Sequence, residues 1–149
     1  MIPLRVRTRF GQLMPFAFIS LKARRVRPRP FLALVYTGSP WTTITPYDSM
    51  MSNIQSSALK KDTEYPEIAF AGYKFWRLLL RNVGLRIKDE TGGVITFDMP
   101  SVSVLMPTKK VPYEEFRGIP SVLGCDFVTI NKLYLHFDPS KNIAFLEKS

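Results

Sequence analysis

The side chains that could carry out chemistry are few in this sequence, and their types exclude several kinds of site. Metal sites are built from clustered His, Cys and carboxylate groups, whereas this chain has a single histidine, His136, and a single cysteine, Cys125. We therefore expect no metal site. His136 lies in an alternating stretch, so we expect an exposed or hydrogen-bonded strand residue rather than a member of a Ser-His-acid triad. Cys125 could be a nucleophile, but we interpret it as a small buried thiol.

Motifs that bind phosphate or dinucleotides are also missing from the sequence. The segments TGG and AGY lack the glycine spacing that a phosphate-binding loop or a dinucleotide fingerprint requires. We therefore expect no cofactor. Together with the scarcity of His and Cys, this removes most common classes of enzyme.

Two short motifs remain as candidates for a functional site, and each follows an apolar run. The first is LVYTGS, where a predicted strand ends in Tyr36-Thr37-Gly38-Ser39. The second is VLGCDF, where Val122 and Leu123 lead into Gly124 and then into a predicted short helix. Between them lies EIAFAGYKFWRLLL, which we interpret as a hairpin with Ala71-Gly72 at or near its tip.

In their order, spacing and β context, these motifs resemble those of the retropepsin-like aspartic peptidases, single-domain relatives of pepsin found in retroviruses and in cells. That family has an apolar pair followed by Asp-Thr/Ser-Gly-Ser/Ala, then a flap hairpin, then an apolar pair with Gly before a helix and a final strand. The resemblance covers roughly residues 14–147. It implies a mainly β, closed barrel-like acid-protease fold with one short C-terminal helix.

The resemblance also implies a homodimer in which each chain supplies half of the catalytic site. Two aspartates, one from each chain, share a proton, because two like charges so close together cannot both ionise. The ionised carboxylate activates a water for attack on a peptide carbonyl. In this scheme the Thr37 hydroxyl bonds across the dimer and Gly38 permits close backbone approach. Ser39 would belong to the substrate-binding residues, as would Ala71, Gly72 and Tyr73 of the flap.

The chain departs from the family pattern at the catalytic position, which Tyr36 occupies instead of Asp. A phenol has a pKa near 10, about six units above that of Asp, so it stays protonated at neutral and acid pH. Two phenol rings would also fill the space needed by water and by the scissile bond. Asp48 and Asp126 lie outside the loop that would face the same loop of the second chain, so neither is expected to replace the missing carboxylate. We therefore expect impaired catalysis.

The chain also differs from the viral enzymes at a pair of charged positions, and the role of the aromatic residues in its predicted flap is open. Cys125 and Pro40 stand where retroviral members commonly carry an Arg and its acidic partner, which implies a different stabilisation of the dimer. In the predicted flap, the aromatic residues Tyr73, Phe75 and Trp76 either form an apolar wall over the substrate or are ordinary core residues. The sequence leaves both interpretations open.

The elements that must position these motifs are mostly strands, because hydrophobicity alternates with a period of two. We predict strands over 16–21, 31–36 and 101–106, a hairpin over 84–99 turning at Gly92-Gly93, and two strands flanking DPSKN at 138–142. Short helices are predicted after Thr45-Pro46 and over 124–132. Such a set of short strands is typical of a closed barrel or a sandwich.

Length and charge bound the remaining possibilities. With 149 residues we expect one domain, 1–149, that includes the basic N-terminal segment 1–30. The net charge of +9 is concentrated in that segment, which has eight Arg or Lys residues and no acid. In RVRTR and RRVRPR the charges alternate as on one edge of a strand, which indicates a solvated face; a nucleic-acid surface is the other interpretation. We expect a cytoplasmic protein without a membrane partner, since no apolar run is long enough to span a bilayer and no signal peptide is recognisable.

Three functional hypotheses follow. The first is a homodimeric retropepsin-like endopeptidase fold acting on peptides or unfolded protein, inactive here because of Tyr36, either as a natural pseudoenzyme or as an altered copy of an active enzyme. The second is a non-catalytic peptide-binding or dimerisation module. The third is a nucleic-acid-binding β-barrel that uses the basic N-terminal segment.

Overall fold

The chain folds mainly into β-strands. The computed structural model describes all residues, 1–149. The strands are β1 (Ile2–Pro3), β2 (Arg5–Arg9), β3 (Gln12–Lys22), β4 (Phe31–Val35), β5 (Thr43–Ile44), β6 (Lys60–Lys61), β7 (Glu67–Phe70), β8 (Tyr73–Lys88), β9 (Val94–Pro107), β10 (Ser121–Leu123), β11 (Leu133–Asp138) and β12 (Ile143–Lys148). The helices are α1 (Pro46–Met51) and α2 (Cys125–Ile130), with 3₁₀ turns at Ser56–Ala58, Tyr113–Phe116 and Pro139–Lys141.

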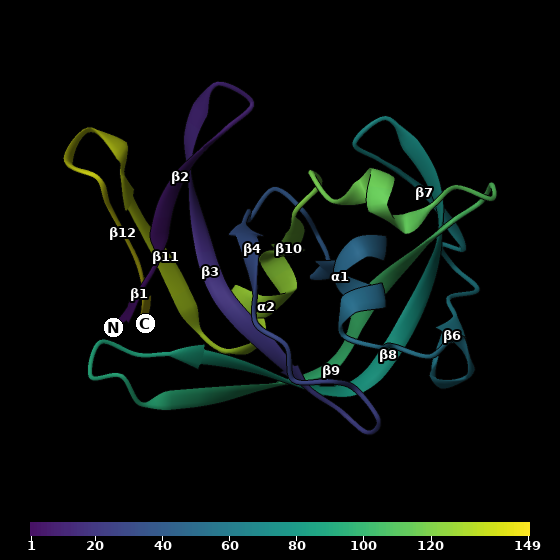
Figure 1. The fold of residues 1–149 in the computed structure, drawn as a ribbon. Coiled ribbons are helices and arrows are strands. Elements are labelled where there is room, and N and C mark those ends of the chain that lie inside the picture. The colour runs from purple at the N-terminus through teal and green to yellow at the C-terminus, as the bar shows by residue number, and fades with distance from the viewer.

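Six of these strands close into a ring, which makes the fold a barrel (Figure 1). The order around the ring is β3, β4, β10, β5, β9 and β8, and β8 returns to β3 with Ile19 opposite Ile87. The pairs β4–β10 and β5–β9 are parallel, whereas the other four pairs are antiparallel. The predicted class, mainly β with a closed barrel and short helices, is confirmed.

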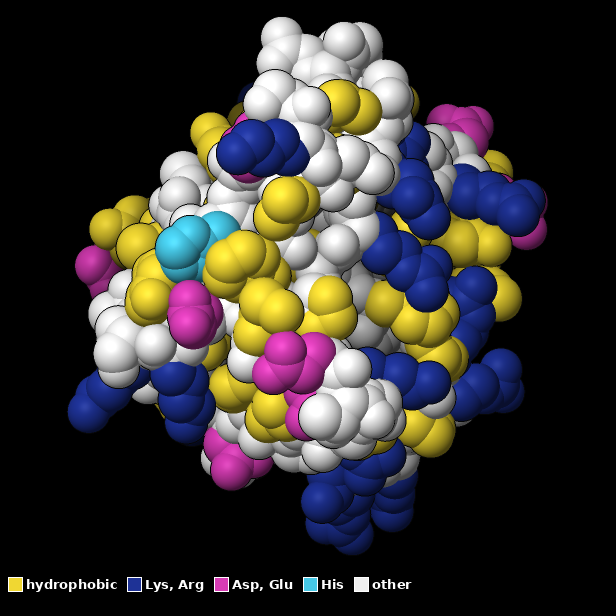
Figure 2. Space-filling view, turned by 90° about the vertical axis from the view of Figure 1, so that its left-hand side faces the viewer, with side chains coloured by type: hydrophobic (Ala, Val, Ile, Leu, Met, Phe, Trp, Pro, Cys, Tyr) yellow, Lys and Arg dark blue, Asp and Glu magenta, His cyan; other side chains and the backbone are white.

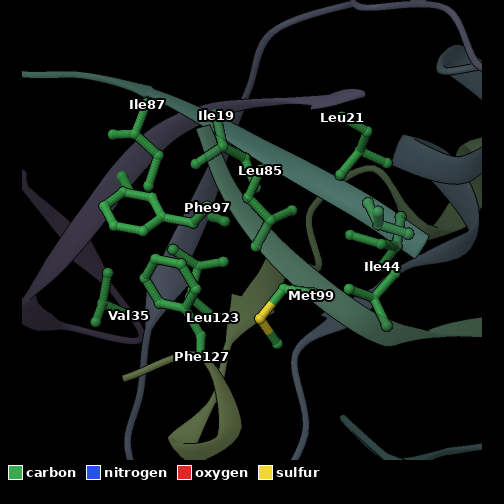
Figure 3. Packing of buried hydrophobic residues seen from close by; sticks show 14 of the residues in the cluster. Ile19, Leu21, Val35, Ile44, Leu85, Ile87, Phe97, Met99, Leu123 and Phe127 are labelled. Atoms are coloured by element: carbon green, nitrogen blue, oxygen red, sulfur yellow. The ribbon is translucent and has the colours of Figure 1, made fainter. Parts of the chain in front are cut away.

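The barrel encloses one large hydrophobic cluster, whose members come from alternate positions of the long strands. Ile19 of β3, Leu85 of β8 and Met99 of β9 belong to it and are buried. Figure 3 shows Phe127 of α2 pointing into this cluster, and its ring meets that of Phe97 edge to face with centroids 5.3 Å apart. Helix α2, which follows the second motif, is thus anchored in the core.

The two chain ends form a second, three-stranded sheet in the order β1, β12, β11. Ile2 pairs with Leu146, and both belong to the main hydrophobic cluster, so this sheet packs on the barrel. His136 lies on β11, where it stacks on Phe145 with centroids 4.4 Å apart and its Nε2 lies 3.4 Å from Glu147. The prediction of a hydrogen-bonded or exposed strand histidine is confirmed.

The structure corrects three local predictions. Residues 24–29 form a turn and loop rather than a strand edge, because Arg25 has a left-handed backbone (φ 61°) and Pro28 lacks the N–H that a strand would use. The stretches 84–99 and 101–106 belong to two long strands, β8 and β9, with no break before residue 101. Cys125 is exposed rather than buried, because it lies in the first turn of α2 on the side away from Phe127.

No helix of the chain has the length and apolar character needed to cross a membrane.

Candidate functional site

The two motifs that the sequence singles out lie side by side in the structure. Strand β4 runs parallel to β10, and the pairing continues into the loop, where the Tyr36 N–H donates to the Leu123 carbonyl at 3.0 Å. The loop then turns, with the Ser39 N–H donating to the Tyr36 carbonyl at 3.2 Å. The Cys125 N–H donates to the Ser39 carbonyl at 2.7 Å. Backbone hydrogen bonds therefore hold residues 36–39 against the Leu123–Cys125 segment.

Gly124 makes this close approach possible because it has no side chain. A Cβ at this position would lie 2.6 Å from the Trp41 carbonyl carbon and oxygen and 2.8 Å from the Ser39 carbonyl oxygen. All three atoms belong to the backbone of the loop, so they have little freedom to move away. The glycine that follows the apolar pair in the second motif thus allows the first motif to pack on it.

Tyr36 projects from the end of β4 into solvent, with 52% of its surface exposed in the single chain. Its ring covers Gly38, where a Cβ would lie 2.5 Å from the ring Cζ. Thr37 is exposed, and the Ser39 hydroxyl donates to the Trp41 carbonyl at 3.0 Å. The loop therefore presents a phenol and a threonine hydroxyl, and no carboxylate.

The two acids nearest in sequence to the motifs have structural partners. Asp126 Oδ1 accepts hydrogen bonds from the Thr42 N–H and hydroxyl, each at 2.8 Å, and the Thr42 hydroxyl accepts from the Gly124 N–H at 3.1 Å. Asp48 is 9% exposed and accepts from the Ser121 hydroxyl at 2.6 Å. Burial raises the pKa of Asp48 above its usual value, although the bond from Ser121 opposes this effect. Neither carboxylate forms a hydrogen bond with Tyr36, so neither assists acid–base chemistry there.

The hairpin between the motifs is present, with β7 and β8 joined by Ala71-Gly72. Both turn residues have positive φ, 51° and 83°, as a tight two-residue hairpin turn requires. Phe70, at the end of β7, packs against a small cluster formed by Phe16 of β3, Leu34 of β4 and Val122 of β10. The hairpin therefore reaches the sheet face next to the Tyr36 loop.

The aromatic residues of the hairpin divide between the two interpretations that the sequence left open. Phe75 is fully buried in a cluster with Leu105 and Phe116, so it is a core residue. Tyr73 is partly exposed, and its ring meets Phe116 edge to face with centroids 5.1 Å apart. Trp76 is also partly exposed. Gly72 and Tyr73 line a cavity of about 330 Å³ beside the hairpin.

A polar network that the sequence did not predict ties the root of this hairpin to the Tyr36 loop. Arg77 of β8 is only 5% exposed, and its Nε donates to the Ser103 hydroxyl at 2.7 Å. Its Nη1 forms an ion pair with Asp62, in the segment that leads to β7. The guanidinium also lies 3.8 Å from the ring centroid of Trp41, two residues after Ser39 of the loop. No local sequence pattern identifies Arg77 as part of this network, because its partners lie at distant positions in the chain.

We predict that this network gives the fold a pH-dependent component of stability. The Glu64 N–H, followed by the Tyr65 N–H and Arg77, holds the pKa of the Asp62 carboxyl below its usual value. A lowered pKa stabilises the folded state above the unfolded-state pKa of about 3.9, and this contribution is lost as the pH falls through the folded-state pKa. Asp62→Asn should therefore lower the free energy of unfolding near neutral pH, and the difference from wild type should shrink in acid.

Urea unfolding of both proteins at neutral pH and at about pH 2.5, below the usual carboxyl range, measures this difference. Asp98→Asn removes an exposed carboxylate on β9 that forms no ion pair, and it should leave stability within about 0.5 kcal/mol at neutral pH. An Asp62→Asn variant as stable as wild type at neutral pH would show that the network does not contribute.

The single chain places Tyr36, Thr37, Gly38 and Ser39 outside its larger cavities. One of these cavities, of about 440 Å³, opens on the sheet face that also carries the Phe16 cluster. In the homodimer that the resemblance implies, a substrate cleft above Tyr36 would lie between two copies of the chain, so this cleft stays a prediction. Ala71 is a residue of the hairpin turn, but contact between Ala71 and a substrate stays a prediction.

Comparison with known proteins finds likeness in structure only. A scan against models of protein families matches none, and a search of curated proteins finds no relative. Among solved structures, the chain matches "EIAV protease complexed with the inhibitor HBY-793" with a TM-score of 0.46 and 15% sequence identity. The match covers 83% of this chain and 92% of that chain.

Proposed function

We propose that this chain is a catalytically silent, retropepsin-like protein that pairs with a second copy of itself and binds an extended peptide at the paired Tyr36 loops. The observation that carries the proposal is the clamped loop 36–39. Its backbone is hydrogen-bonded to the Leu123–Cys125 segment in the order that the resemblance implies, whereas its first side chain is a phenol. The scaffold of a catalytic loop is thus retained without its carboxylate.

The absence of hydrolysis follows from the side chains at this loop. A neutral phenol cannot accept the proton of the attacking water, and two rings facing each other would occupy the position of that water. Asp48 and Asp126 are committed to Ser121 and Thr42, so neither replaces the missing base. Binding of a peptide needs only the apolar wall, the hairpin and backbone groups.

Pairing of two copies is part of the proposal because half a cleft has little surface on which to hold a peptide. A two-fold axis brings identical surfaces together, so Thr37 of one copy would face Thr37 of the other. Thr37 and Tyr36 are exposed in the single chain, as residues at such an interface would be. The N-terminal strand β1 already pairs with β12 of its own chain, so the contact is expected at the loops.

We expect wild type to sediment as a dimer at high micromolar concentration and Thr37→Arg to weaken the dimer by about tenfold or more, since like charges would meet at the axis. Ser140→Arg, on the exposed turn between β11 and β12, adds the same charge elsewhere and should leave the dimer intact. A monomeric wild type, or equal behaviour of the two variants, would contradict the proposed pairing. Wild type should also bind, without cleaving, an unfolded protein substrate.

A further inference from the structure

The cavity of about 440 Å³ lies between the β2–β3 hairpin, the start of β4, helix α1 and the segment that precedes β10. Its walls include apolar side chains of Phe16, Leu32 and Ile119. Leu32 and Leu34 are on the same face of β4, and the alternation continues to Tyr36 about 13 Å from Leu32. The cavity and the Tyr36 loop thus share one face of the sheet.

Four arginines line this cavity, namely Arg7 and Arg9 of β2, Arg29 of the loop before β4, and Arg117. None of them forms an ion pair within the chain. The one carboxylate at the cavity, Asp48, is buried and accepts a hydrogen bond from Ser121; the nearby charge of Arg29 acts to lower its pKa, but the two groups form no ion pair. The cavity therefore carries a strong excess of positive charge. Figure 2, which faces the side of the molecule with β11 and β12, shows Lys and Arg side chains gathered along its right-hand part with hydrophobic side chains between them.

Arg29 gives an independent indication that this charge serves a ligand. Its Nη1 is buried but has no hydrogen-bond partner in the chain. A buried charged donor without a partner is costly, and in native proteins such groups are normally satisfied. An acceptor from a bound molecule would satisfy it.

We propose that this cavity binds acidic side chains of an extended peptide, which would make the bound peptides Asp- or Glu-rich. The proposal rests on the proposed function, because the same peptide would continue along the sheet face to Tyr36. Arg7 and Arg9 leave one face of β2 about 7 Å apart, which matches the spacing of alternate side chains on an extended peptide. Their guanidinium groups bind carboxylates with paired hydrogen bonds.

The apolar wall favours a peptide over a nucleic acid. Of the aromatic residues at the cavity, Phe16 and Phe31 are buried, and Tyr47 is half-buried with the Arg117 guanidinium 5.6 Å from its ring centroid. The cavity therefore offers no fully exposed ring on which a base could stack. Alternate apolar side chains of a peptide would instead contact Leu32 and Ile119, while the acidic ones meet the arginines. A nucleic acid would use the positive charge and leave the apolar wall without a partner.

The test measures fluorescence anisotropy of a labelled peptide of alternating Glu and Leu, and of a matched peptide with Gln in place of Glu. The Glu peptide should bind at least about tenfold more tightly to wild type, and its binding should weaken as salt is added. Arg29→Gln and Arg117→Gln should each lose about tenfold for the Glu peptide and little for the Gln peptide. Arg24→Gln, in the same loop as Arg29 but outside this cavity, should bind like wild type.

Competition separates the possible ligands. Inorganic phosphate or a thymidine oligonucleotide that displaces the Glu peptide at similar concentrations would overturn the assignment to peptides. Equal binding of the Glu and Gln peptides would overturn the acidic preference and leave the proposed peptide binding intact. Binding of neither peptide would overturn both proposals. Arg117 is exposed, so its variant tests the site even where Arg29→Gln lowers stability.

Discussion

Under the proposed function, replacement of Tyr36 by aspartate should yield a peptide hydrolase with an acidic optimum. Aspartate at this position would supply one carboxylate from each copy, and a pair that shares one proton provides both the base and the acid of the reaction. The exchange removes the ring that covers Gly38, so it creates space rather than requiring it. The carboxylate pair should raise turnover of an unfolded protein by roughly 100-fold or more, the range typical of a general base.

The matched control is Tyr36→Asn, which has nearly the same shape as Tyr36→Asp but no ionisable group. Both variants and wild type would be assayed with an unfolded protein between about pH 3 and pH 6, which spans the usual carboxyl range. Only Tyr36→Asp should be active, and a transition-state-mimicking inhibitor of aspartic peptidases should abolish its activity. A folded, dimeric Tyr36→Asp protein without activity would show that catalysis was lost at more than one residue.

Gly124→Ala should strongly destabilise the folded chain. The added Cβ would overlap backbone atoms of Trp41 and Ser39 at 2.6–2.8 Å, so the Tyr36 loop or β10 must move. Overpacking of this kind costs about 1–3 kcal/mol, and more where the backbone is the obstacle. We expect the free energy of unfolding to fall by about 3 kcal/mol, measured by urea denaturation.

Gly118→Ala is the control for the same chemical change. A Cβ at Gly118 meets no atom within 4 Å, and its backbone is not left-handed. Its effect should stay below about 1 kcal/mol. Equal stability of the two variants would contradict the close approach of the loop to Gly124, on which the description of the site depends.

Local patterns in the sequence were enough to predict most of the strands. The alternation in β3, β11 and β12 and the turn residues between them are properties of neighbouring residues, so they are visible without the fold. The hairpin tip at Ala71-Gly72 was predicted for the same reason. Closure of the ring depends on the pairing of Ile19 with Ile87, which are far apart in the chain. The strand pattern alone was therefore compatible with a barrel or a sandwich, and the resemblance favoured the closed barrel.

The failures have a common physical origin in contacts between distant residues. Exposure of Cys125 depends on which side of α2 faces the core. A helix of six residues is too short for the periodicity of its hydrophobic residues to show which side that is. The network of Arg77, Asp62 and Trp41 joins three separate segments. Arg29 and Arg117 meet at one cavity although 88 positions separate them, so composition revealed an excess of basic residues but not where they gather.

The most direct test of the account is a disulfide cross-link between two copies at Thr37. Thr37→Cys would be made in a Cys125→Ser background, so that the new thiol is the only one, and Ser140→Cys in the same background would be the control. A disulfide requires Cα atoms within about 7 Å, so it forms readily only if the two loops face each other. The account predicts rapid, near-complete dimer cross-linking at Thr37→Cys under mild oxidation and little at Ser140→Cys. Equal or absent cross-linking at Thr37→Cys, in protein shown by sedimentation to be dimeric, would contradict it.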